Sequence, residues 1–387
     1  MAPTADGARR GGGFPHIAIV LAGLGAGGAE RVVSLISGRW VEEGHRVTVI
    51  AFDRVDAPVF HAIDPRIRLV RLGIEPGGGG RLAGVRAVLR RIAALRRTLA
   101  DVAPDVTISF LTKINVLTLL ASLGTGRRVI VSERNNPRMQ QASRVWTLLL
   151  ARLHWRAEGI VMQTRASLAC LGAAARRRAS VIPNPISVHP VEGPPRDGHV
   201  LAATGRLTWQ KGFDMLIDAF ALVAPAYPDW TLAIWGEGED RPLLEKRIAR
   251  HRMADRISLR GNSRSPDEWV GQADAFVLSS RYEGFGNVLG EAMAGGLPVA
   301  AFNCDFGPAE MIRPEEDGLL VPCGDVPGLA GALGRLMGDG ELRARLGEAA
   351  RRSARRYRPE AIQQRWDDLL AGMDIRRSIR GARSVPC

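Results

Sequence analysis

Short apolar segments of strand length alternate with helical stretches along most of this chain, and this alternation constrains its fold more than any other feature. Residues 16–22 are typical of a fully buried strand, which leads through a glycine-rich turn into a helix at about 29–43. Such alternation predicts parallel sheets covered by helices on both faces, so the expected fold class is α/β. Further strands are expected at 46–52, 67–72, 106–110, 129–132, 159–163, 200–205, 231–235, 257–259, 275–278, 298–302 and 318–321, and the last helices at about 326–337, 341–356 and 360–371.

The chain length and a proline-rich interruption predict two domains. With 387 residues and roughly 150 residues per domain, a single core is improbable. Prolines 183 and 185 and the segment 191–198 interrupt the pattern, because proline fixes the backbone and removes a hydrogen-bond donor. We expect a disordered start at 1–14, a Rossmann-like domain at 15–185 on which the C-terminal helix packs back, a linker at 186–198, a second Rossmann-like domain at 199–372 and a basic tail at 373–387.

The positive charge is concentrated in the first half of the chain. Residues 1–190 carry 27 basic and 12 acidic residues, whereas residues 191–387 carry 26 and 28, so the formal net charge of +13 belongs to the first half. A basic half indicates an anionic partner such as a membrane or a phosphorylated substrate, or else scattered solvated arginines. Three tyrosines and no zinc-finger or aromatic RNA motif argue against specific nucleic-acid binding.

The cysteines and the hydropathy of the chain indicate in which cellular compartment we expect the protein. The four cysteines lie far apart in the sequence, which predicts neither a disulfide framework nor a zinc site and favours a reducing compartment. The longest apolar run, residues 17–29, is well short of the ~20 residues that span a bilayer. It superficially resembles a signal peptide, but a strand, turn and helix continue through it. We therefore expect a cytoplasmic protein without a transmembrane helix.

The glycine turn after the first strand predicts phosphate binding. Gly23, Gly25 and Gly28 fit the G-x-G-x-x-G spacing of a dinucleotide site, and Asp53 ends the next strand where such a site holds a ribose. Glycines also let a helix N-terminus approach any phosphate, or simply allow a tight turn. The motif alone leaves a cofactor, a substrate phosphate and a structural turn open.

Two stretches of the first half combine leucines with arginines. Residues 81–99 place apolar side chains at helical spacing among arginines 86, 90, 91, 96 and 97, and residues 138–156 add Trp146 and Trp155. Such helices can lie on an anionic membrane, or they can be ordinary surface helices that pack on the sheet.

Two segments of the second half carry the strongest chemical pattern. Arg206 and Lys211 share one loop between a strand and a helix, and two such cations suit a diphosphate. Glu283 and Glu291 lie on either side of the predicted N-terminus of a helix at 287–294, where free amides bind phosphate or sugar hydroxyls. A hydrolytic carboxylate pair is the alternative, but it conflicts with the two phosphate motifs.

Taken in order, these motifs resemble the retaining glycosyltransferases of family 4 over residues 16–371. The resemblance rests on Gly27 to Arg31 (GGAER), Ile182 to Pro185 (IPNP), the Arg206 and Lys211 loop, and Glu283-x7-Glu291. It implies the GT-B architecture, in which two facing Rossmann-like domains enclose the active site. It also implies a nucleotide-sugar donor, no obligatory metal and no cofactor, in agreement with the absence of an Asp-x-Asp sequence.

The resemblance assigns roles to individual residues. Gly27 and Gly28 would approach the donor diphosphate, and Arg206 with Lys211 would neutralise it. Glu283 would bind the donor sugar, and Glu291 the ribose near Val288. Its catalytic set is Glu283, Arg206 and Lys211, and its donor-binding set adds Gly27, Gly28, Phe285, Gly286, Asn287, Val288 and Glu291.

One segment departs from the family pattern. Many relatives have a His just after the strand that corresponds to residues 129–132, where this chain has Arg134, followed by Asn135 and Asn136. We expect these three residues on the acceptor or sugar side. The segments 132–136 and 304–310 more narrowly resemble enzymes that extend glycans on polyprenyl diphosphate, including α-1,4-N-acetylgalactosaminyltransferases.

The leading hypothesis is therefore a retaining glycosyltransferase that moves a UDP-linked hexose or N-acetylhexosamine to a lipid-linked or polysaccharide acceptor in bacterial glycan assembly. It would be peripheral on the inner face of the cytoplasmic membrane. Three alternatives remain: a nucleotide-sugar epimerase of the same fold, an NAD-dependent dehydrogenase, and an inactive membrane-bound scaffold.

Overall fold

The computed structural model describes residues 14–25, 27–74, 81–136, 138–139, 144–187, 199–263 and 265–373. Almost all of the expected disordered start, of the expected linker and of the basic tail lies outside these ranges. The described chain forms two compact units. Within the described ranges, the first comprises residues 14–132, 144–160 and 366–373, and the second comprises residues 133–139 and 161–365.

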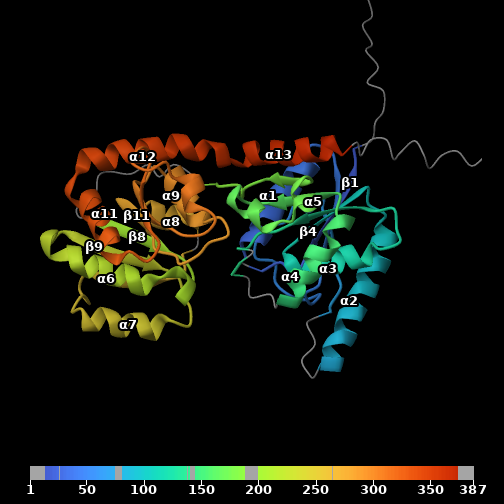
Figure 1. Ribbon diagram of the computed structural model, residues 1–387, viewed down its shortest axis with the longest axis horizontal. Helices are drawn as coiled ribbons and strands as arrows, with labels where there is room; N and C mark the ends of the chain where they lie inside the picture. The colour runs from blue at the N-terminus through green and yellow to red at the C-terminus, as the bar shows by residue number, and fades with distance from the viewer. Residues whose placement is uncertain are drawn as a thin grey trace, which may run out of the picture. The chain divides into compact units, whose positions relative to one another are not determined.

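Two sheets organise the chain, and they share one strand order over their first six strands (Figure 1). The first has seven strands in the order β3-β2-β1-β4-β5-β6-β7, and the second has six in the order β10-β9-β8-β11-β12-β13. The strands are β1 His16–Leu21, β2 Arg46–Ala51, β3 Arg68–Arg71, β4 Val106–Phe110, β5 Arg128–Ser132, β6 Gly159–Met162, β7 Ala179–Val181, β8 His199–Thr204, β9 Trp230–Trp235, β10 Ile257–Gly261, β11 Ala275–Leu278, β12 Val299–Asn303 and β13 Leu319–Pro322.

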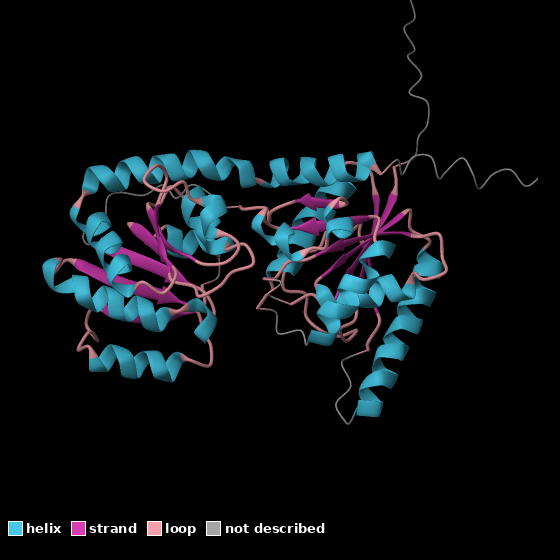
Figure 2. Cartoon of the chain, viewed as in Figure 1, coloured by secondary structure: helices cyan, strands magenta, loops and turns pink. Residues whose placement is uncertain are grey.

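Helices occupy the connections between the parallel strands, and Figure 2 shows them on two sides of each sheet. The α-helices are α1 Gly28–Glu42, α2 Arg81–Val102, α3 Thr112–Ala121, α4 Arg144–Leu153, α5 Ala173–Arg176, α6 Phe213–Val223, α7 Arg241–Arg250, α8 Pro266–Val270, α9 Asn287–Ala294, α10 Pro308–Met311, α11 Val326–Gly338, α12 Gly340–Ala354 and α13 Pro359–Gly372. The 3₁₀ turns are η1 His154–Arg156, η2 Ala166–Cys170, η3 Trp209–Lys211, η4 Ala224–Ala226 and η5 Arg355–Tyr357.

The strand order confirms the predicted α/β class. β8 pairs in parallel with both β9 and β11, and β1 with both β2 and β4. In each sheet the connection reverses direction at that central strand, as in doubly wound nucleotide-binding folds. Ligands of such folds bind at the carboxyl edge beside the reversal. The loops that follow β8 and β11 lie at this edge of the second sheet.

Continuous apolar burial explains why these segments form central strands. Every residue of β1 is buried, as expected of a parallel strand covered on both faces. In the first unit, Trp366 of α13 is fully buried and packs edge to face on Trp40 of α1, whose Nε1 donates a hydrogen bond of 2.8 Å to Asp367 Oδ1. No helix in the described ranges has the length and apolar composition that a membrane span requires.

Candidate functional site

Two loops of the second unit follow neighbouring strands and are bonded to each other. Gly212 has φ of +62°, and a Cβ there would overlap the Ser279 carbonyl oxygen, so only glycine fits without a backbone shift. The Ser279 hydroxyl donates to the Lys211 carbonyl at 2.9 Å, and the Arg281 N–H donates to the Gln210 carbonyl at 2.8 Å. The loop after β8 is therefore fixed on the loop after β11.

Arg281, which the sequence did not single out, clamps the two loops together. Its guanidinium donates two hydrogen bonds to the Asp214 carboxylate, at 2.8 and 2.7 Å, and one to the Trp209 carbonyl at 2.7 Å. It also lies over the Trp209 ring, 4.7 Å from the centroid. Burial alone would raise the pKa of Asp214, but the bonds from Arg281 outweigh it and hold that pKa below its ordinary value.

The predicted cation and carboxylate meet directly in this loop pair. Lys211 Nζ lies 2.6 Å from Glu283 Oε1, and the Ser280 hydroxyl donates to the same oxygen at 2.7 Å. The Glu283 side chain is 7% exposed and that of Lys211 is 17% exposed, so water screens the pair only weakly. Arg206 is exposed in the same loop, and its guanidinium forms no hydrogen bond or ion pair within the described ranges. The edge therefore presents one neutralised and one unneutralised cation.

The N-terminus of α9 adds backbone donors to this edge. Gly286 precedes the helix at φ of +90° and has no side chain to cap it, so N–H groups of the first turn are available to an anion. Phe285 is buried edge to face on Tyr357, with ring centroids 5.4 Å apart. Asn287 and Val288 are half-buried in the first turn, and Glu291 is buried one turn later.

A third loop, which carries part of the narrower resemblance, lies against Glu283. The Glu283 N–H donates to the Asp305 carbonyl at 3.3 Å. Gly307 has φ of +146°, and a Cβ there would overlap the Phe285 carbonyl oxygen. Burial, and next the Glu283 charge, raise the pKa of the Cys304 thiol, so this thiol stays protonated near neutral pH.

Arg134 is buried and hydrogen-bonded within the second unit. Its Nη1 donates to the Ile182 carbonyl at 3.0 Å and to Asn184 Oδ1 at 2.9 Å. Asn184 Nδ2 in turn donates to Asn287 Oδ1 at 2.7 Å, so a relay of side chains connects Arg134 to the first residue of α9. Burial lowers the pKa of Arg134 to about 9, which still leaves the guanidinium charged at neutral pH.

The two asparagines that follow Arg134 differ in exposure. Asn135 is exposed, whereas Asn136 is buried and its Oδ1 accepts the N–H groups of Arg138 and Met139, at 2.8 and 3.2 Å. This is the local geometry of an Asx turn. Asn135 is thus the one of the pair that is open to solvent.

Gly27 and Gly28 belong to the first unit, at the start of α1. Gly27 is the N-cap and has no side chain to offer the helix. The Glu30 carboxylate folds back to Gly27, where a Cβ would overlap it. Burial raises the pKa of this carboxyl.

Asp53 is used inside its own unit. Its Oδ2 accepts the Leu24 N–H at 3.0 Å, and a Cβ on Gly23 would lie 3.2 Å from it. The carboxylate therefore stabilises the glycine turn. This structural role explains why an aspartate follows β2, and it does not require a bound ribose.

Two successive doubly wound sheets define a two-domain Rossmann-like fold, and the second sheet carries a cationic edge beside a helix N-terminus. Family models specify the class further. Residues 27–185 match the glycosyl transferase 4-like domain, and residues 187–353 match the glycosyl transferases group 1 family. The chain belongs to the GT-B glycosyltransferase superfamily.

Relatives agree with this assignment. The chain is 33% identical to an exopolysaccharide phosphotransferase of Streptomyces coelicolor over 73% of its own length and 30% of that protein. It is 34% identical to the lipopolysaccharide core biosynthesis glycosyltransferase LpsE of Rhizobium meliloti, over 46% and 51%. The chain thus spans 30% and 51% of the lengths of these two curated relatives. The Anabaena protein HepE in complex with UDP and glucose shares the fold at a TM-score of 0.75 and 20% identity, over 92% of this chain and all of that one.

Proposed function

We propose that this protein is a retaining glycosyltransferase that transfers a hexose or N-acetylhexosamine from a UDP-sugar to a lipid-linked or polysaccharide acceptor in bacterial glycan assembly. No metal and no cofactor take part in this proposal. The observation that carries it is the Lys211–Glu283 ion pair at the carboxyl edge of the second sheet, with Arg206 in the same loop. At this edge the cations can bind a diphosphate, and the carboxylate can accept hydrogen bonds from sugar hydroxyls.

Each group has a role in the proposed reaction. As the glycosidic bond to the nucleotide breaks, negative charge develops on the leaving diphosphate, and Lys211 and Arg206 stabilise it. The first-turn amides of α9 bind phosphate or sugar oxygens. Glu283 accepts hydrogen bonds from donor-sugar hydroxyls, and Glu291 from the ribose. Ser280 and Lys211 hold the Glu283 carboxylate in one orientation for that purpose.

Related proteins support the substrate classes. The names of the curated relatives place them in exopolysaccharide and lipopolysaccharide synthesis, which motivates a glycan acceptor here. HepE was solved with UDP and glucose, which motivates a uridine nucleotide. Within these classes, the segments 132–136 and 304–310 favour N-acetylgalactosamine as the sugar.

A surface of the first unit supports peripheral binding to the inner face of the cytoplasmic membrane. Val85 and Leu89 of α2 are 58% and 59% exposed, and Leu148 of α4 and Trp155 of η1 are 57% and 66% exposed. Exposed arginines 86, 90, 97, 144 and 152 accompany them on the same helices. Apolar side chains among cations match the chemistry of an anionic lipid interface.

A donor panel tests the proposal. Purified protein is incubated with UDP-glucose, UDP-galactose and their N-acetylamino counterparts, with bacterial membrane lipid extract as acceptor. UDP release and product mass are followed, and the anomeric configuration is read by NMR. We expect one donor to be consumed only when acceptor is present, with retention, and Lys211→Ala and Glu283→Ala to lose the activity. Conversion of one UDP-sugar into another without acceptor would instead identify an epimerase.

A further inference from the structure

A second cationic region lies on α12 and η5, outside the residues assigned to the donor. Residues 343–358 contain seven arginines and one glutamate, although residues 191–387 as a whole carry a net charge of −2. Arg345, Arg352 and Arg356 recur at intervals of seven and four residues, which places them on one helical face.

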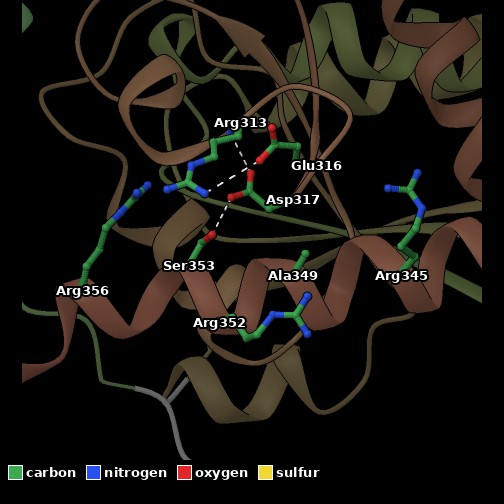
Figure 3. Close-up of a pocket in the computed structure, with 8 residues that line it drawn as sticks. All are labelled: Arg313, Glu316, Asp317, Arg345, Ala349, Arg352, Ser353 and Arg356. Carbon is green, nitrogen blue, oxygen red and sulfur yellow. Dashed lines mark hydrogen bonds and ion pairs between the residues drawn. The ribbon is translucent and has the colours of Figure 1, made fainter.

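This face lines a pocket of about 610 Å³, drawn in Figure 3. Arg313, from the turn between α10 and β13, supplies a fourth guanidinium to the same pocket. A volume of this size lies within the range of small-molecule sites, roughly 300–1,000 Å³. The pocket shares no lining residue with the Lys211–Glu283 edge.

Of the two acidic residues that line the pocket, the buried one is already engaged. Asp317 is 1% exposed, and its Oδ1 accepts the Arg313 N–H at 2.6 Å while its Oδ2 accepts the Ser353 hydroxyl at 2.6 Å. These bonds hold the turn against α12. The Asp317 carboxylate therefore has a structural role in the pocket wall. Within the described ranges it forms no ion pair with a guanidinium that lines the pocket.

Two of the arginines keep their charge available. Arg356 Nη2 donates to the carbonyls of Glu310 and Met311, at 3.0 and 2.9 Å, and these neutral acceptors fix the guanidinium without cancelling its charge. Arg313 has Glu316 at 3.7 Å, but both side chains are more than 60% exposed, so that pair is weak. Figure 3 shows the Arg313 and Arg356 guanidinium groups pointing toward each other. An anion between them would relieve the repulsion of like charges.

We propose that the Arg313–Arg356 end of this pocket binds the phosphate of an organic phosphate monoester. Two guanidinium groups match such a group in charge, because a phosphate monoester carries nearly two negative charges at neutral pH, and their planar forks match its oxygens. The organic part lies along α12 toward Arg345, whose position is about 16 Å further along the helix axis. This site is independent of the proposed transferase activity.

Calorimetric titration of the full-length protein with glycerol 3-phosphate tests the site. Arg313→Gln is the main variant, because it removes an exposed guanidinium and keeps the backbone N–H that binds Asp317. Arg356→Gln is the second. Arg355→Gln is the matched control, since Arg355 is exposed on η5 but does not line the pocket. We expect each pocket variant to weaken binding at least about tenfold and the control to leave it within twofold.

Two further arms complete the test. Lys211→Ala should retain the binding, which separates this pocket from the proposed donor site even if no transferase activity is found. Vesicles containing phosphatidic acid present the same monoester on a lipid. If the protein binds these vesicles and Arg313→Gln abolishes that binding, the ligand is a lipid headgroup. If the protein binds glycerol 3-phosphate but not the vesicles, the ligand is a soluble phosphate monoester. Either result supports the site. Equal weakening by Arg355→Gln, loss with Lys211→Ala, or no saturable binding of either probe would overturn it.

Discussion

Lys211 Nζ lies 2.6 Å from Glu283 Oε1, and both side chains are largely withdrawn from water. A cation and a carboxylate at this depth stabilise each other, so removal of one leaves the other desolvated and unbalanced. The Ser280 hydroxyl is the remaining partner of Glu283 Oε1. The pair consequently connects the stability of the two loops with the proposed binding of donor.

A double-mutant cycle on this pair should show strong coupling. Lys211→Met and Glu283→Gln should each lower the free energy of unfolding by about 1–3 kcal/mol, and the double variant by less than their sum. Each single variant should also lower UDP release at least about tenfold, since each loses a charged contact to donor. Urea unfolding and a UDP-release assay provide the measurements. Wild-type turnover by Glu283→Gln would contradict its assignment.

The glycines of the two loops provide a matched pair of substitutions. Gly212 and Gly286 both have positive φ, +62° and +90°, and alanine in that conformation costs about 1–2 kcal/mol. A Cβ on Gly286 would have its nearest neighbours at 3.8 Å, whereas one on Gly212 would overlap the Ser279 backbone. Gly212→Ala should therefore destabilise the protein more than Gly286→Ala in thermal unfolding. Equal destabilisation by the two substitutions would mean that the backbone at Ser279 moves away from the new Cβ without a cost in free energy.

The relay from Arg134 through Asn184 to Asn287 predicts a positioning role. Asn184→Ala removes an acceptor from a buried guanidinium and a donor to the first residue of α9. We expect a loss of about 1–3 kcal/mol in stability and a fall in kcat, because the helix terminus loses a lateral support. Asn135→Ala is the control, since Asn135 is adjacent in sequence and exposed. If Asn135→Ala alone reduced kcat, the exposed asparagine would be the functional one.

Local periodicity explains why the fold was predictable. Buried parallel strands such as β1 are continuous apolar runs, and the expected positions of the other long strands agree with the structure to within one or two residues. The strand β7 was missed, because its three residues are too few to form a pattern. The helix expected over 138–156 is shorter, since α4 covers Arg144–Leu153 and η1 follows. Residues 137 and 140–143 lie outside the described ranges.

The site was only partly predictable. Arg206, Lys211, Glu283 and Glu291 lie in contiguous motifs that glycines mark in the sequence. Arg281 was missed, and Asn184 was noted in the IPNP segment without a role, because their partners are 67 and 103 residues away and only the folded chain brings them together. The hydrogen-bond partners of the Arg134 side chain could not be predicted either, because its acceptors are 48 and 50 residues further along the chain.

Acid should destabilise the protein through His16. Burial, and next the Arg46 charge, lower the pKa of His16 from 6.5 to about 4, and its Nε2 lies 2.9 Å from the Thr48 hydroxyl. Between these two pKa values the unfolded chain binds the extra proton, so the free energy of unfolding should fall as pH drops from 6.5 to 4. The full effect is about 3 kcal/mol. In His16→Gln, the free energy of unfolding measured with urea should depend less on pH between pH 4 and 6.5. An unchanged pH dependence would contradict the assignment to His16.

Exposed and anchored arginines of α2 should differ in membrane binding. Arg86 and Arg90 are exposed beside Leu89, whereas Arg91 Nε donates to the Ile74 carbonyl at 2.9 Å and Arg96 Nη1 to the Leu123 carbonyl at 2.7 Å. Each arginine near an anionic surface contributes about 1 kcal/mol. Replacing both exposed arginines with glutamine should therefore weaken binding to phosphatidylglycerol vesicles about 30-fold.

The anchored pair is the control for this experiment. Arg91→Gln with Arg96→Gln removes the same charge but breaks contacts inside the unit, including the stacking of Arg91 on the Phe52 ring at 5.0 Å. This variant should lose thermal stability and keep most of its vesicle affinity, the reverse of the exposed pair. Co-sedimentation and thermal unfolding of both variants read the two effects separately. Equal loss of vesicle binding would show that the attraction depends on net charge and not on this face of α2.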